Sequence, residues 1–268
     1  MKVSDKVFVV TGGGNGVGRE LVLGLLSRGA RVAAVDISTQ ALEKTAWLCG
    51  SCRDRLSTHT ADITSLEAVQ GLPDEVLAAH GTVDGIINNA GIIHPFLTLD
   101  EIGFDMIKKV MDVNFSGMLY MTKTFLPYLL ARPEAHITNI SSMGALFPVP
   151  GQTVYGASKA AAKLMTEGLR AELKTTKVQV MAVFPGGIGT KILDHSGVET
   201  TQRMQKVQKI FKLLSPGKAA RIIIRGIEHR RSRLTPGVDA SLTDIFCRMS
   251  PIVAAQWIYR IMKFIIQE

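Results

Sequence analysis

Short apolar runs rich in β-branched residues alternate along the chain with longer segments whose apolar residues recur at helical spacing. The first pair is "KVFVV" at 6–10 and a helical pattern over 16–27, which stops just before Gly29, a residue type favoured past a helix end. The same pattern predicts strands at 6–10, 31–36, 55–62, 135–142 and 178–186, and a strand followed by a loop over 83–91. It predicts helices at 16–27, from the N-cap Ser38 to about Trp47, at 65–79, within 98–131 with a break near Asn114–Gly117, and at 155–175.

Strands that alternate with helices favour a parallel sheet covered on both faces, because each parallel connection needs a crossover that a helix supplies. We therefore predict an α/β fold built on one doubly wound parallel sheet of the Rossmann type, with a helical C-terminal extension. No linker or low-complexity tract interrupts the pattern before residue 190. The whole chain, residues 1–268, is expected to form a single domain.

Composition narrows the class of protein. Hydrophobic residues make up 46% and charged residues 20%, as in a globular protein with a sizeable core, and no apolar run approaches the ~20 residues that span a bilayer. The three cysteines are few and odd in number, which favours a reducing, cytoplasmic location. Cys49 and Cys52 have no second pair nearby, so we expect neither a metal site nor a redox centre. The first residues lead directly into a strand, so no targeting segment is expected.

The net charge of +8 is concentrated near the C-terminus. Residues 201–268 hold 13 Lys and Arg against 4 Asp and Glu, a local balance of +9, so the first 200 residues are close to neutral. The basic stretch "HRRSR" at 229–233 is short and lacks interleaved aromatic residues. We therefore expect no binding to nucleic acid.

A glycine-rich loop, "TGGGNGVG" at Thr11–Gly18, joins the first strand to the first helix. Ligands of such sheets bind beyond the carboxyl ends of the strands, where a helix N-terminus offers free N–H groups and partial positive charge to a phosphate. Asp36 ends the second strand, 18 residues after Gly18, where its carboxylate can accept hydrogen bonds from the two hydroxyls of an adenosine ribose. The combination predicts a dinucleotide-binding site.

The glycine spacing reads T-G-x-x-x-G-x-G, and four further motifs follow it in order: "NNAG" at 88–91, "NISS" ending at Ser142, "YGASK" at 155–159 and "PGGIGT" at 185–190. Over residues 6–190 the chain resembles the classical short-chain dehydrogenase/reductase family, and its tail resembles bacterial members with an extended C-terminus. The resemblance implies an oxidoreductase that interconverts an alcohol and a carbonyl compound with a nicotinamide cofactor. We also expect a homo-oligomer, either a dimer or a tetramer.

Tyr155 and Lys159 are four residues apart and therefore share one face of the predicted helix. An ammonium beside the phenol would lower the pKa of Tyr155 and suit it to proton transfer. Ser142 ends a strand 13 residues earlier, and strand alternation lets only one of Ser141 and Ser142 face a substrate. The resemblance implies that Ser142 orients the substrate oxygen and that Asn114 holds a water linked to Lys159. The expected catalytic set is Asn114, Ser142, Tyr155 and Lys159.

The glycine loop and the resemblance together imply a larger set of cofactor contacts. They are Gly12, Asn15, Gly16, Val17, Gly18, Asp36, Ile37, Asp62, Ile63, Asn89, Ala90, Gly91, Tyr155, Lys159, Ile188 and Thr190. An NADP site needs a cation near the 2′-phosphate, whereas Asp36 would repel it and is followed by Ile37 and Ser38. We therefore predict NAD as the cofactor.

The loops expected around the substrate, 92–97 and 143–152, are both apolar. They favour a lipophilic alcohol or carbonyl compound, although the same residues would also serve plain core packing. His94 is interpreted as a loop residue that either contacts the substrate or has no such role.

The segment after residue 190 is predicted to form a substrate lid at 190–215, with a basic amphipathic helix at 200–214. A further helix is expected at 216–233, a short strand within 234–240, and a C-terminal extension at 236–268. The extension would close the substrate pocket, pack against another subunit, or contact a membrane surface. In the last case the protein would be peripheral at the membrane.

An alternative function is a non-catalytic dinucleotide-binding regulator or interaction protein on the same scaffold, because a fold does not fix a function. The complete catalytic set favours the enzyme.

Overall fold

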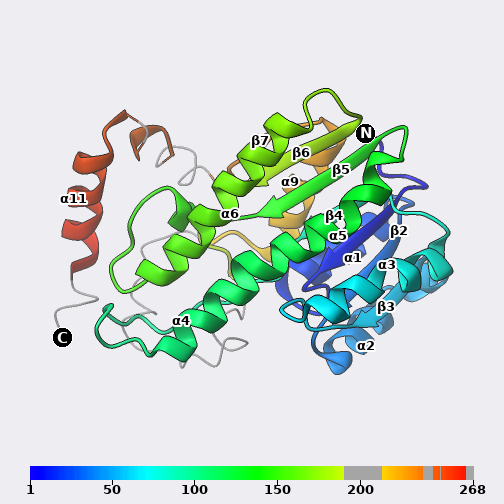
Figure 1. Cartoon of the computed structure of the whole chain (residues 1–268), viewed down its shortest axis with the longest axis horizontal. Helices are drawn as coiled ribbons and strands as arrows, with labels where there is room; N and C mark the ends of the chain where they lie inside the picture. The colour runs from blue at the N-terminus through cyan, green and yellow to red at the C-terminus, as the bar shows by residue number, and fades with distance from the viewer. Residues whose placement is uncertain (190–212, 238–243, 248, 264–268) are drawn as a thin grey trace.

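The computed structural model describes residues 1–189, 213–237, 244–247 and 249–263 (Figure 1). Within them, a seven-stranded parallel sheet has the strand order β3-β2-β1-β4-β5-β6-β7. The strands are β1 (Val7–Thr11), β2 (Arg31–Asp36), β3 (Leu56–Thr60), β4 (Gly85–Asn88), β5 (Ala135–Ile140), β6 (Val178–Val183) and β7 (Arg233–Leu234). The predicted doubly wound α/β fold is confirmed.

Eight α-helices have their bounds within the described residues: α1 (Gly16–Leu26), α2 (Thr39–Leu48), α3 (Leu66–His80), α4 (Phe104–Met111), α5 (Met118–Leu130), α6 (Thr153–Glu172), α9 (Pro216–Glu228) and α11 (Pro251–Met262). Residues 244–247 are also helical. Three shorter helical segments connect them: η1 (Gly50–Arg55), the π-helix η2 (Asp112–Gly117) and η3 (Met143–Ala145). The break predicted near Asn114–Gly117 is η2. Ser38 caps α2 as expected, since its Oγ accepts a hydrogen bond from the N–H of Ala41 at 3.2 Å.

The two faces of the sheet are covered by different helices (Figure 1). Side chains alternate between the faces along each strand, so Val10 packs with α1, α2 and α9, while Val9 packs with α3, α5 and α6. The strands between the two edge strands, β3 and β7, are largely buried, which explains why β1, β2 and β6 read as continuous apolar runs.

The order of the strands creates a crevice at one edge. From β1 the chain first builds outward through β2 and β3, then returns to place β4 on the other side of β1. The connections leaving the carboxyl ends of β1 and β4 therefore diverge, and a crevice opens between them. The glycine loop and the "NNAG" loop both lie at this point.

The predicted helix over 216–233 was wrong in its C-terminal part. α9 ends at Glu228, and Arg230 has a left-handed backbone (φ 52°) that cannot continue a helix. Arg233 then pairs with Ala182, so the last strand begins one residue before the range 234–240. The first helix within 98–131 was also predicted too early, because Gly103 is still extended and α4 begins at Phe104.

Most of the predicted lid at 190–215 and of the basic helix at 200–214 falls outside the described residues, as does Thr190. The division of the chain into one domain, a lid and an extension therefore stays a prediction. The helical C-terminal region is present as α11, which lies at one end of the molecule (Figure 1).

Candidate active site

The glycine loop packs so tightly that larger residues would not fit. Gly12 has a positive φ of 67°, and a Cβ on Gly18 would lie 1.9 Å from the carbonyl oxygen of Gly12. The absence of a side chain at Gly18 therefore lets the start of α1 pack closely against the backbone that follows β1. The Asn15 side chain makes no capping bond to α1, and its Oδ1 accepts a hydrogen bond from Arg19 instead. The first amides of α1 are left to face the crevice, as a phosphate site requires.

Asp36 is held in place by two backbone amides. Its Oδ2 accepts a hydrogen bond from the N–H of Gly14 at 2.9 Å, and its Oδ1 accepts one from the N–H of Ser38 at 3.0 Å. Each carboxylate oxygen can accept a further bond. The half-buried carboxylate therefore offers acceptors at the end of β2 for a pair of hydroxyl donors.

The loops after β1 and β4 are tied together. Thr11 Oγ1 accepts hydrogen bonds from the N–H groups of Asn89 (3.0 Å) and Ala90 (3.1 Å), and Asn89 Nδ2 donates to the Thr11 carbonyl at 3.0 Å. The two walls of the crevice are thus fixed relative to each other.

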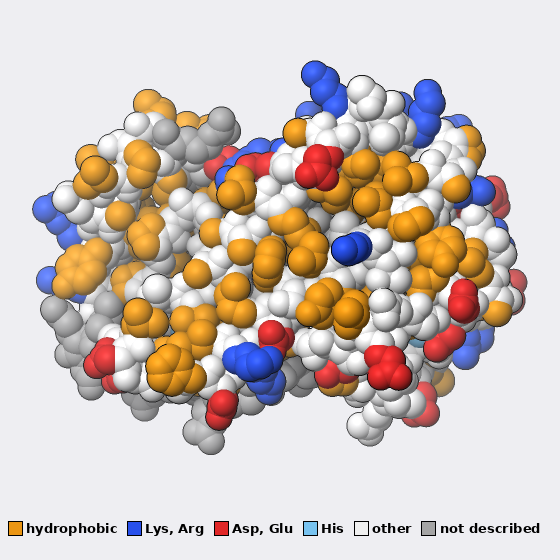
Figure 2. All heavy atoms as spheres, in the orientation of Figure 1, with side chains coloured by type: hydrophobic (Ala, Val, Ile, Leu, Met, Phe, Trp, Pro, Cys, Tyr) orange, Lys and Arg blue, Asp and Glu red, His pale blue; other side chains and the backbone are white. Residues whose placement is uncertain are grey.

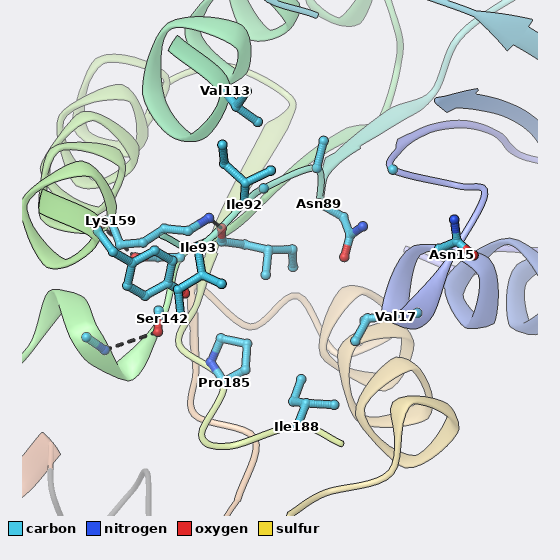
Figure 3. Close-up of a pocket in the computed structure, with 18 of the residues that line it drawn as sticks. Asn15, Val17, Asn89, Ile92, Ile93, Val113, Ser142, Lys159, Pro185 and Ile188 are labelled. Carbon is cyan, nitrogen blue, oxygen red and sulfur yellow. Dashed lines mark hydrogen bonds between the residues drawn. The ribbon is translucent and has the colours of Figure 1, made fainter. Parts of the chain in front are cut away.

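Ser142 and Tyr155 face the same cleft, from the end of β5 and the first turn of α6. Ser142 Oγ accepts a hydrogen bond from the N–H of Gly144 at 3.1 Å, drawn as a dashed line in Figure 3. Ser141 Oγ instead donates to the carbonyl oxygen of Lys159 at 2.8 Å and is buried. The alternation of the strand therefore directs Ser142, and not Ser141, into the cleft.

Burial dominates the proton affinities of the two titratable groups. It raises the pKa of the Tyr155 phenol, and a hydrogen bond with Ser142 opposes that shift. Burial lowers the pKa of Lys159 to about 8. Lys159 is 4% exposed, and its Nζ donates to the carbonyl oxygen of Ile140 at 3.2 Å. The expected lowering of the Tyr155 pKa was wrong, because burial acts in the opposite direction.

Asn114 lies in the π-helix η2 and is completely buried. Its Oδ1 accepts from the N–H of Ile92 at 2.9 Å, and its Nδ2 donates to the Ile92 carbonyl and to Ser158 Oγ, both at 3.0 Å. A Cβ on Gly91 would lie 3.0 Å from Lys159 Nζ and 3.1 Å from Asn114 Oδ1, so both groups border the space that this glycine leaves. Asn114 therefore fixes the loop after β4 and stands near the ammonium.

A single cleft of about 1200 Å³ connects these parts. Figure 3 shows Asn15 and Val17 at one end of it and Ser142 and Lys159 at the other. Most of the predicted cofactor contacts line it: Gly12, Asn15, Gly16, Val17, Asp36, Ile37, Asp62, Ile63, Asn89, Ala90, Gly91, Tyr155, Lys159 and Ile188. Gly18 and Asn114 support the walls from behind, and Thr190 lies outside the described residues.

Two cations of the cleft were missed in the sequence analysis. Arg19 and Lys44 line the end near Asp36, although the cations there were sought only in the glycine loop and directly after β2. Arg19 donates to the Gly14 carbonyl and, through Nε, to Thr45 Oγ1 at 3.0 Å, and burial lowers its pKa. At the other end the cleft is lined by Gln152, which belongs to the expected loop 143–152, and by Met262, which belongs to the extension for which closure of the pocket was one expected role. Helical spacing alone could have placed Arg19 on the turn that follows the loop.

No cluster of His, Cys, Asp and Glu suited to a metal ion is found among the described residues, where Cys49, Cys52 and Cys247 are free thiols.

Comparison with known proteins places this cleft in a family. Residues 6–200 match the family model described as short chain dehydrogenase. SadH of Mycobacterium tuberculosis is 36% identical over 250 residues, which cover 91% of this chain and 90% of SadH. A Burkholderia phymatum short-chain dehydrogenase/reductase solved with NAD has a TM-score of 0.87 at 25% identity and covers 95% of this chain and 97% of its own. A Burkholderia cenocepacia short-chain dehydrogenase solved with NADP has a TM-score of 0.79 at 25% identity, over 98% and 99%.

The chain therefore belongs to the short-chain dehydrogenase family, and it is an oxidoreductase of that family. The two similar structures differ in their cofactors, so they support a nicotinamide dinucleotide without choosing between NAD and NADP.

Proposed function

We propose that this protein is an NAD-dependent oxidoreductase that interconverts a lipophilic alcohol and the matching carbonyl compound. The observation that carries the proposal is the continuity of one cleft from the glycine loop to Ser142 and Tyr155. Purified protein is tested with NAD against steroids, retinoids, long-chain alcohols and small diols, following the absorbance of NADH. Turnover with long-chain or polycyclic alcohols supports the proposal, and turnover only with small diols would contradict the lipophilic substrate.

In the proposed reaction Ser142 donates a hydrogen bond to the substrate oxygen, and Tyr155 exchanges a proton with that oxygen. During oxidation the phenolate takes the hydroxyl proton, and during reduction the phenol returns a proton to the developing alkoxide. The bound nicotinamide ring would accept or supply the hydride. Lys159 lies one turn from Tyr155, and its positive charge would stabilise the phenolate. With a pKa of about 8, Lys159 is mostly charged at neutral pH.

The dinucleotide fits the residues present. The Gly12–Gly18 contact leaves no room for side chains where a pyrophosphate must approach the backbone, and Asp36 has free acceptor capacity for ribose hydroxyls. NAD is favoured over NADP because the Asp36 carboxylate would repel a 2′-phosphate. The nearby Arg19 keeps its positive charge and offsets part of this repulsion, but its Nε and Nη2 are already hydrogen-bonded to Gly14, Asn15 and Thr45.

The double substitution Asp36→Ala and Ile37→Arg should raise the ratio of kcat/KM with NADP to that with NAD by at least ~tenfold, the size of one charge-assisted hydrogen bond. The ratio is measured by steady-state kinetics with both cofactors. Glu43→Ala removes an exposed carboxylate from α2 and serves as the control, which should leave the ratio unchanged. An unmodified protein that already prefers NADP would show that Asp36 has been misinterpreted.

The lipophilic substrate is supported by the walls of the cleft beyond Tyr155. Apolar side chains from five separate segments line the cleft: Ile92, Ile93, Phe96, Met143, Phe147, Val149, Pro185, Leu213 and Met262. α11 packs against this wall through Ala254, Ile258 and Met262. We therefore propose that the C-terminal extension helps to close the substrate end of the cleft.

Ile258→Ala should raise KM for a long-chain alcohol at least ~threefold more than for a small alcohol, because the shortened side chain loosens α11 from the apolar wall. Ile258 is 5% exposed, whereas Ile252 on the same helix is 74% exposed, so Ile252→Ala is the matched control. Truncation after Ser250 should also raise KM more for the long-chain alcohol than for the small one, and by a larger factor than Ile258→Ala. Equal changes in KM for both alcohols would contradict a role in the pocket.

The predicted homo-oligomer is supported by apolar side chains left exposed on α4, α5 and α6. Phe104 is 88% exposed, Leu119 36% and Leu164 69%, and Figure 2 shows apolar side chains gathered over these helices. A second copy of the chain is the partner we propose for this face.

Contact with a membrane stays a prediction. α11 exposes Ile252, Val253 and Trp257 close to Arg260, a combination suited to an anionic surface. Among the described helices, none combines the length and the apolar character that crossing a bilayer requires.

A further inference from the structure

His94 joins the loop after β4 to the first turn of α6. Its side chain is buried, and its Nε2 accepts a hydrogen bond from the backbone N–H of Tyr155 at 3.4 Å. Its Nδ1 lies 2.6 Å from the carbonyl oxygen of Pro95. A carbonyl can only accept and an amide N–H can only donate, so a neutral ring must carry its proton on Nδ1 and leave Nε2 bare.

The first turn of α6 needs such an acceptor. The N–H of Tyr155 is one of the amides at a helix start that have no partner within the helix. The N-cap residue, Gln152, makes no side-chain capping bond. Its Nε2 donates instead to the carbonyl oxygens of His94 at 2.8 Å and Pro95 at 3.2 Å. His94, which belongs to a loop distant along the chain, therefore accepts the hydrogen bond that an N-cap side chain usually accepts.

The neutral ring suits this position. Burial lowers the pKa of His94, so the ring stays unprotonated at neutral pH. A helix N-terminus is electrically positive, and it favours a bare nitrogen over an imidazolium. A protonated ring would also present two N–H groups and could no longer accept from Tyr155.

The same loop is fixed at two further points. The N–H of Leu97 donates to the Gly151 carbonyl at 3.2 Å, and Ile92 is held on both sides of its backbone by Asn114. The loop therefore links η2 to the start of α6. Ile93 and Phe96 of this loop line the cleft, whereas His94 does not.

We propose that His94 is a positioning residue, which caps α6 at Tyr155 and so fixes the phenol relative to Ser142 without touching substrate or cofactor. The proposal rests on the proposed function, because it assigns His94 a purpose only if Tyr155 transfers the proton. Small displacements of a reacting group lower turnover strongly, so loss of the cap should affect kcat more than the binding of NAD.

The test compares His94→Leu, which removes the acceptor, with His94→Gln, whose amide oxygen reaches to about the position of Nε2. His80→Leu is the control, since His80 is also buried but contacts Ser57, in β3. Hydrogen exchange is followed by mass spectrometry in a peptide that covers residues 152–158. Exchange should become faster in His94→Leu only, and kcat should fall about tenfold with KM for NAD within about twofold. His94→Gln should restore both.

An unchanged exchange rate in His94→Leu would overturn the cap, and an unchanged kcat would overturn the positioning role. Failure of His94→Gln to restore either quantity, or an equal loss of kcat in His80→Leu, would point to general destabilisation and also overturn it. A wild-type protein with no NAD-dependent turnover would remove the proposed function and the positioning role with it. The exchange rates would still show separately whether the cap exists.

Discussion

Replacing Tyr155 with Phe should lower turnover at least ~100-fold while leaving the dissociation constant of NAD within about twofold. Phenylalanine keeps the ring and its packing, but it lacks the hydroxyl that bonds to Ser142 and that would carry the proton in the proposed reaction. The loss should appear in kcat and in kcat/KM alike, because the missing interaction belongs to the transition state. Steady-state kinetics and isothermal titration calorimetry with NAD measure the two quantities.

Tyr128→Phe is the matched control. Tyr128 lies on α5, where its ring packs at 6.5 Å from that of Phe125, and loss of its hydroxyl should leave kcat near the wild-type value. Near-normal turnover in Tyr155→Phe would rule out Tyr155 as the acid and base. A protein that binds NAD but turns over none of the tested alcohols, with or without the substitution, would favour the non-catalytic regulator instead.

The parts of the cleft that the sequence predicted are those with local causes. The contact between Gly12 and Gly18 needs glycine at a fixed spacing within one loop. Asp36 ends strand β2, and its Oδ1 accepts a hydrogen bond from the N–H of Ser38, only two residues further along the chain. Tyr155 and Lys159 share a face of α6 through helix geometry alone. Each of these placements depends on a stretch of chain short enough for spacing to determine it.

The parts that were missed depend on contacts between distant segments. His94 is 61 residues from Tyr155 along the chain, and no periodic pattern links the two. The C-terminal extension had three expected roles, and the contact of Met262 with the cleft arises because α11 packs against the loops that carry Phe96 and Phe147. The end of α9 was missed for another reason. Arg230 has a left-handed backbone conformation, which is uncommon for residues other than glycine and could not be predicted from the local sequence.

Lys159 connects stability with activity in a way that can be measured. Burial lowers its pKa to about 8, against an ordinary value of 10.5, so the folded state disfavours the charged form. Below pH 8 the lysine is charged in the folded and the unfolded protein, and burying that charge costs about 3 kcal/mol of the free energy of unfolding. The cost falls as the pH rises through 8, where the folded protein releases the proton, and is gone above 10.5, where the unfolded chain has released it too.

Lys159→Met should therefore raise the free energy of unfolding at pH 7 by about 2 kcal/mol, since the lost hydrogen bond to the Ile140 carbonyl offsets about 1 kcal/mol of the gain. The gain should shrink as the pH is raised from 8 towards 10.5.

Turnover by Lys159→Met should fall on the order of 100-fold, because the cation beside the phenolate is gone. The control is Lys163→Met, one turn further along α6, where the lysine is 28% exposed and paired with Glu167, so that both stability and turnover should change little. Urea unfolding at several pH values and steady-state kinetics on both variants measure the effects. A loss of stability in Lys159→Met at pH 7 would show that favourable interactions of the buried ammonium outweigh the cost of its desolvation. A gain in stability with full turnover would mean that the charge at this position serves neither the fold nor the proposed reaction.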